Sequence, residues 1–128
     1  MKYLILIIGF LLITSTAQSA TDSELCMEFK NFEKMTNKNL PQKIDEYTEV
    51  VTIGVNCESK SIKYTKRFLF YENMMAEGWK ERKQRQHTQL HCNKDGLSRT
   101  VKWIAMDVIY DNDFQYLGTL TTSPTDCE

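Results

Sequence analysis

The sequence predicts an α+β domain with two layers and the element order α-β-β-α-β-β, in which both helices lie on one face of an antiparallel sheet. Three observations lead to this prediction. Apolar residues recur at helical spacing in two segments, and four shorter segments have strand patterns separated by turn-forming residues. Four cysteines lie within the same part of the chain, which indicates a disulfide-bonded domain.

The N-terminus has the layout of a secretory signal peptide. Lys2 supplies a positive charge, the apolar run YLILIIGFLLI follows, and small residues come next. Small side chains at positions −3 and −1 permit cleavage after Ala17 or after Ser19, so we assign the signal peptide to residues 1–19 and a single secreted domain to residues 20–128. A spanning helix needs about 20 apolar residues. We therefore expect no stable membrane insertion after cleavage, and a periplasmic or secreted location.

Charge and composition weigh against two kinds of function. The chain contains 16 Lys and Arg against 17 Asp and Glu, and loss of Lys2 with the leader leaves 15 against 17, a net charge of −2. Such a chain has no general attraction to nucleic acid or to anionic membranes. Aromatic residues make up 11% of the sequence. That content supports a packed core, so disorder is not expected.

The cysteines are spaced as in a structural disulfide framework: Cys26, Cys57, Cys92 and Cys127. The sequence has no C-x-x-C, which argues against a redox-active pair or a zinc ribbon. Four cysteines permit three pairings. We prefer Cys26–Cys57 with Cys92–Cys127, because each bridge would then tie a helix to its own hairpin.

The first half of the domain reads as a helix followed by a hairpin. Residues 21–37 predict the helix, because Thr21 and Glu24 match a capping box and apolar residues then repeat along one face. Period-two alternation predicts strands at residues 51–57 and 62–70. A short polar turn joins them, which is typical of a β-hairpin.

The second half repeats that order. Residues 72–91 predict a helix, although Gly78 weakens it by about 1 kcal/mol. The sequence NKDG then stops it. Residues 101–110 predict a strand that is central in the sheet, because apolar residues occupy both of its faces. Residues 116–122 predict the last strand, and a tail pinned by its cysteine follows.

Basic residues gather on the second predicted helix. We take these side chains as the candidate binding site for an acidic protein partner: Lys80, Arg82, Lys83 and Arg85. The alternative is an ordinary solvated helix face. The outer face of the sheet, with Lys63, Thr65 and Arg67, is a second candidate surface.

Two histidines at helical spacing form a candidate metal site. His87 and His91 share a helix face and could meet one ion, with Cys92 adjacent. The zincin pattern needs glutamate after the first histidine, and Thr88 stands there. We therefore predict neither a metal site nor a cofactor, and take both histidines as ordinary helix residues.

Catalytic patterns are missing from the sequence. It contains no G-x-S-x-G elbow and no glycine-rich phosphate loop. Asp107 lies in an apolar strand and needs a partner if it is buried. Asp111 and Asp113 are typical of a turn, since a calcium loop needs a glycine and a glutamate that do not follow. We predict no catalytic residues and no enzyme.

Short motifs in the second and last quarters of the chain suggest a relationship. Pro41, Ile44, Asp45 and Thr48 form P-x-x-I-D-x-x-T, and the terminal motif D-C ends at Cys127. This layout resembles short exported periplasmic proteins of Gram-negative bacteria that have no assigned function. The resemblance implies a periplasmic address and brings no catalytic residues.

These observations predict a non-enzymatic periplasmic or secreted module that binds a protein partner and no nucleic acid. One alternative is an inhibitor or immunity protein against a toxin or an envelope hydrolase. Another is a periplasmic metal carrier that uses His87 and His91.

Overall fold

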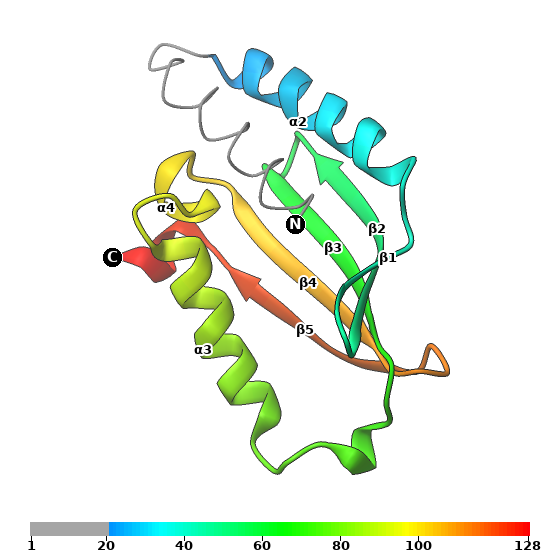
Figure 1. Ribbon diagram of the computed structural model, residues 1–128. Coiled ribbons are helices and arrows are strands. Elements are labelled where there is room, and N and C mark those ends of the chain that lie inside the picture. The colour runs from blue at the N-terminus through cyan, green and yellow to red at the C-terminus, as the bar shows by residue number, and fades with distance from the viewer. Residues whose placement is uncertain (1–20) are drawn as a thin grey trace.

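The computed structural model describes residues 21–128 (Figure 1), and the predicted signal peptide lies outside these residues. Within them no helix is long and apolar enough to cross a bilayer. The elements are, in chain order, α2 (Asp22–Asn37), β1 (Gln42–Asp45), β2 (Thr48–Asn56), β3 (Ser61–Phe68), the 3₁₀ turn η1 (Glu72–Met74), α3 (Trp79–Cys92), α4 (Leu97–Thr100), β4 (Ile104–Tyr110), β5 (Tyr116–Thr122) and the 3₁₀ turn η2 (Pro124–Cys127).

The five strands form one mixed sheet in the order β1-β2-β3-β4-β5. β3 and β4 are parallel, and the other neighbours are antiparallel. The α+β class is confirmed, but a purely antiparallel sheet was the wrong prediction. The physical reason is the connection between β3 and β4: it carries α3 and α4 back along the sheet, so β4 starts at the same end as β3.

Both long helices cover the same face of the sheet (Figure 1). Phe29 of α2 is buried against Trp103, with 4.5 Å between ring centroids, and the two rings join apolar side chains of β2 and β3. Trp79 of α3 packs instead on a second cluster that includes Phe68 and Leu120. The other face of the sheet carries no helix in residues 21–128, so the domain has two layers.

Helix α2 begins as its sequence predicts and is fastened to the sheet by polar side chains. The hydroxyl of Thr21 accepts a hydrogen bond from the Glu24 amide at 3.1 Å, as in an N-cap. At the other end, Asn37 bonds both peptide groups of Ile53, each at 2.9 Å. β1 pairs only with the first part of β2. Ile53 lies beyond the part of β2 that β1 covers. There the Asn37 amide makes the hydrogen bonds that a neighbouring strand would make.

Two disulfides join the helices to the sheet region. Cys26 in α2 is bonded to Cys57, just after β2, and Cys92 at the end of α3 is bonded to Cys127 in the C-terminal turn. This is the pairing that the sequence analysis preferred. Each bridge connects a helix to the strands of its own half of the chain.

Several elements differ from their predicted bounds. The strands predicted at residues 51–57 and 62–70 are β2 (Thr48–Asn56) and β3 (Ser61–Phe68). The helix predicted at residues 72–91 is α-helical only from Trp79 and extends to Cys92, because Gly78 has a left-handed φ of 76° and is the N-cap of α3. The strand predicted at residues 101–110 begins at Ile104, since α4 and a left-handed Lys102 (φ 64°) precede it. β1 and α4 were not predicted. Both are four residues long, too short for a periodic signal.

Candidate functional site

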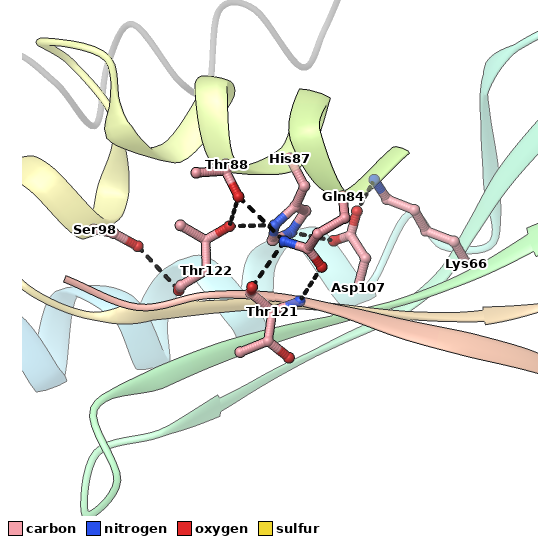
Figure 2. Close-up of polar contacts among 8 residues, drawn as sticks. All are labelled: Lys66, Gln84, His87, Thr88, Ser98, Asp107, Thr121 and Thr122. Carbon is pink, nitrogen blue, oxygen red and sulfur yellow. Dashed lines mark hydrogen bonds and ion pairs between the residues drawn. The ribbon is translucent and has the colours of Figure 1, made fainter. Parts of the chain in front are cut away.

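A row of polar side chains is buried between α3 and the sheet (Figure 2). Lys66 of β3 and Asp107 of β4 form an ion pair with 2.7 Å between Nζ and Oδ2. The other carboxylate oxygen, Oδ1, lies 3.7 Å from Nε2 of His87 on α3. Nδ1 of His87 is hydrogen-bonded to the Thr122 hydroxyl of β5 at 2.7 Å. The row thus joins α3 to three strands.

Asp107 is the buried carboxylate that the sequence left without a partner, and the structure supplies two. Only 6% of the residue is exposed. Burial by itself raises the pKa of Asp107, but the interactions with His87 and with the Lys66 ammonium outweigh it, so this pKa lies below its ordinary value. The carboxylate is therefore held in its charged form.

The order carboxylate, imidazole and hydroxyl is also that of a nucleophilic triad. Here the hydroxyl belongs to Thr122, which is fully buried at 0% exposure. The 3.7 Å separation between Asp107 and His87 is longer than a hydrogen bond. A buried Thr122 hydroxyl that no substrate reaches cannot act as a nucleophile. The polar contacts of this row instead attach α3 to the sheet.

Gln84 extends the attachment to the outer side of β5. Its side-chain amide donates to the carbonyl of Thr121 at 3.0 Å and accepts from the Thr121 amide at 3.3 Å. On the next helix, α4, the hydroxyl of Ser98 donates to the Thr122 carbonyl at 3.2 Å. Figure 2 shows these bonds converging on the end of β5.

The two histidines of the candidate metal site, which the sequence analysis took as ordinary helix residues, lie side by side, with 4.6 Å between ring centroids. Burial, and then the neighbouring His87, lower the pKa of His91 to about 4. Both nitrogens of His87 already face protein groups, namely Thr122 and Asp107. Within residues 21–128 no group of three or more His, Cys, Asp or Glu side chains is placed to hold a metal ion.

A hollow of about 250 Å³ opens beside the first turns of α3. Its lining has an apolar part and a basic and polar part: Phe70, Met74, Met75, Ala76, Trp79, Arg82, Lys83 and Gln86. Met74 is 68% exposed, and Met75 and Trp79 are half-buried. Small-molecule sites usually measure about 300–1,000 Å³. The volume of this open hollow lies below that range.

The predicted basic residues do not form one patch, because they lie at different angles around α3. Arg82 and Lys83 line the hollow, where Arg82 also donates to the carbonyl of Glu77 at 2.8 Å. Lys80 lies toward β5, with its ammonium 5.7 Å from the centre of the Trp79 ring. Arg85 is exposed and lies outside the hollow.

The second candidate surface lies on the open face of the sheet. Lys63 is exposed there, and Thr65 is half-buried. Arg67 is already engaged, because it pairs with Glu49 at 3.1 Å and lies 4.7 Å from the centre of the Phe114 ring. This face therefore offers fewer unpaired charges than the sequence suggests.

The segment from Asp111 to Asp113 forms a turn. Oδ1 of Asp111 accepts hydrogen bonds from the amides of Asp113 at 2.8 Å and Gln115 at 3.0 Å. These bonds shape the connection between β4 and β5. The carboxylate that would open a calcium loop is thus used by the backbone.

Sequence reasoning missed the apolar lining of the hollow and the role of Lys66. Phe70, Met74 and Met75 were placed in a strand and a helix that the structure ends earlier or starts later. The useful signal was Gly78, since a break there makes the preceding methionines part of a loop. Lys66 reaches Asp107 only through the parallel pairing of β3 and β4.

No protein-family model matches the chain, and no curated protein matches it. Two solved structures share its fold. A Pseudomonas aeruginosa protein provisionally assigned as secreted (PA3611) has a TM-score of 0.65 and 14% identity, covering 86% of this chain and 100% of that chain. The pilotin EpsS of the Vibrio vulnificus type 2 secretion system has a TM-score of 0.62 and 11% identity, covering 84% and 94%. Likeness at this identity shows a common fold.

Proposed function

We propose that this chain is a periplasmic or secreted module without enzymatic activity, which binds a segment of a partner protein in the hollow beside α3. The observation that carries the proposal is the composition of the hollow. Methionine, phenylalanine and tryptophan side chains form its apolar part, and two cationic side chains stand at the same place. The expected partner segment has an apolar anchor side chain next to acidic residues.

Each part of the hollow suits a protein ligand. Methionine adapts its shape to different side chains, and tryptophan and arginine are enriched among the residues that dominate binding energy at interfaces. Met74 ends the 3₁₀ turn η1 and Met75 follows it, whereas Trp79, Arg82 and Lys83 come from α3, which Gln84 and His87 attach to the sheet. A partner would thus meet one adaptable wall and one rigid wall.

Two further observations support the proposal. The two disulfides suit an oxidising compartment outside the cytosol. One structural neighbour is a pilotin of a type 2 secretion system, and its likeness supports a partner that belongs to a protein assembly of the bacterial envelope. The buried Asp107–His87–Thr122 row favours a structural role over catalysis, because its hydroxyl is closed to substrates.

Site-directed cross-linking tests the proposal. A photoreactive amino acid at position 86, in the hollow, should capture one envelope protein in intact cells, and the same group at position 30 of α2 should not. With the captured partner purified, R82E/K83E should weaken binding by more than about tenfold in calorimetry.

R85E is the matched control, because Arg85 carries the same charge on the same helix but lies outside the hollow. It should change affinity by less than about twofold. Equal capture from positions 86 and 30, or equal losses for R82E/K83E and R85E, would reject the hollow as the binding site.

A further inference from the structure

The outward backbone groups of β5 are hydrogen-bonded at one end of the strand and have no hydrogen-bond partner near its middle, within the described residues. β5 is the last strand of the sheet, so one side of its backbone has no neighbouring strand. At Thr121 the Gln84 amide bonds both outward peptide groups, as a sixth strand would. Asn37 does the same for Ile53 on β2. In both places a helix side chain shields part of a strand edge, a common protection against unwanted pairing.

The peptide groups of Thr119 point in the same direction as those of Thr121. Residues two apart in an antiparallel strand direct their N–H and C=O groups to the same side. Val108 and Thr119 are paired across β4 and β5, in step with Met106 and Thr121. Within residues 21–128 no side chain bonds these outward groups of Thr119; its hydroxyl bonds Tyr116 instead, at 2.7 Å.

A cation stands beside this open stretch. The end of the Lys80 side chain lies over Gly118 of β5, with Nζ 3.2 Å from the point where a Cβ of that glycine would lie. Glycine at this position leaves room for the lysine stem. Lys80 is exposed, and no carboxylate in the described part of the chain pairs with it.

We propose that the edge of β5 at Thr119 receives an extended, acidic segment of a partner protein as an added strand. The Thr119 N–H would donate to a carbonyl of the segment, and the Thr119 C=O would accept from one of its amides. Lys80 would pair with a carboxylate of the segment, which is the charge complementarity that selects an acidic occupant. Gln84 ends the pairing, because Thr121 is already bonded. This site is separate from the hollow.

Selection from a random peptide library displayed on phage tests the proposal on the intact disulfide-bonded protein. The native chain should select peptides rich in Asp and Glu. Binding of the synthetic peptides should fall by more than about tenfold in T119P, which removes the outward N–H, and by less than about twofold in T119A, which keeps it. In NMR titrations the largest amide shifts should fall on Thr119 and its neighbours in β5.

Lys80 provides a second test that does not alter the backbone. K80E should weaken peptide binding more than K80M, which keeps the stem above Gly118, and both should bind less well than the native chain. These variants keep the proposal testable if T119P fails to fold.

Three results would overturn the proposal. One is a failure to recover any peptide. Another is peptides that respond to R82E/K83E but not to T119P or K80E, which would uphold the hollow and reject the edge. The third is a native dimer, seen by light scattering and lost in T119P, which would make a second copy the occupant. Peptides whose binding falls in T119P and K80E but not in R82E/K83E would support the β5 edge as a binding site and would give no support to the hollow.

Discussion

Lys66 and Asp107 form an ion pair whose two members differ in exposure. The lysine side chain is 22% exposed and the aspartate side chain 8%. Removing one member of a buried pair usually costs more than the pair contributes, because the other charge stays desolvated. The partial exposure of Lys66 lowers this cost, since the variant admits some water.

K66M should therefore reduce the free energy of unfolding by about 2–3 kcal/mol at neutral pH, measured in urea. The control is K60M. The Lys60–Asp22 pair is equally short, at 2.8 Å, but both side chains are well exposed, so its loss should cost less than about 1 kcal/mol. Equal losses of unfolding free energy in K66M and K60M would show that burial of the Asp107 carboxylate does not require the Lys66 ammonium.

His91 makes stability depend on pH. Its pKa is lowered in the folded protein to about 4, so the folded state takes up a proton less readily than the unfolded chain, whose ordinary value is about 6.5. Stability from this residue is thus fully present above pH 6.5 and is lost as the pH falls through 4.

The loss between pH 6.5 and 4 should be on the order of 2 kcal/mol, measured by urea unfolding at a series of pH values. H91Q should flatten the curve in this window. The pKa of Asp107, which is also lowered, adds a further loss of stability at lower pH as that carboxylate becomes protonated. An unchanged curve in H91Q would assign the effect to other groups.

At this scale the sequence showed that Asp107 needed a partner but not which one. Lys66 is 41 positions away and meets it through the register of a parallel strand pair. Local periodicity contains no information about such a register. The pairing of His87 with Thr122 depends on how α3 is placed on the sheet, which is equally remote from sequence patterns.

At the scale of elements, the start of α3 depends on the backbone of one residue. Gly78 has a φ of 76°, where glycine alone is relaxed, and a Cβ there would lie 3.1 Å from Nη1 of Arg82. G78A should lower the free energy of unfolding by about 1 kcal/mol.

Gly54 of β2 provides the comparison for G78A. A Cβ at Gly54 would be no closer than 3.9 Å to another atom, so G54A should be neutral or slightly stabilising. Thermal unfolding of both variants checks the difference. A G78A protein as stable as G54A would mean that the turn before α3 adjusts without strain.

Elements with a long, regular pattern were predicted well. The helix at residues 21–37 and the strand at 116–122 agree with α2 and β5, because each has a regular pattern of residues that face the core. The helix predicted at residues 72–91 was too long. Its first part is apolar for another reason, since Met75 packs on the second core cluster from a loop.

At the scale of the whole molecule, two bridges hold an otherwise small core. They span 31 and 35 positions of the chain. Loops of this length predict a stabilisation of about 3–4 kcal/mol for each bridge, through restriction of the unfolded chain. A domain of this size is only marginally stable without such links.

C26S/C57S and C92S/C127S should each lower the free energy of unfolding, measured in urea, by about 3–4 kcal/mol. The two double variants should differ in which helix becomes locally less stable. Hydrogen exchange should increase in α2 for the first variant and at the end of α3 for the second. Similar exchange patterns in both would show that the two halves unfold as one unit.

The architecture was predicted from the order of its elements, and its mixed sheet was not. Two hairpins and two helices allow several arrangements, and the parallel contact of β3 with β4 follows from a long connection rather than from any residue. The candidate site was also predicted only in part. The basic residues of α3 were identified, but Arg82 and Lys83 line the hollow whereas Lys80 lies over Gly118 of β5.

The pairing also bears on the order in which the disulfides form, because each disulfide joins two cysteines that are consecutive in the chain. A polypeptide that enters an oxidising compartment N-terminus first closes the earlier link before the third thiol arrives. The later two thiols then find only each other. Oxidation in order of emergence would give the native connectivity without reshuffling, so we expect an oxidase alone, with no isomerase, to suffice for maturation of this protein.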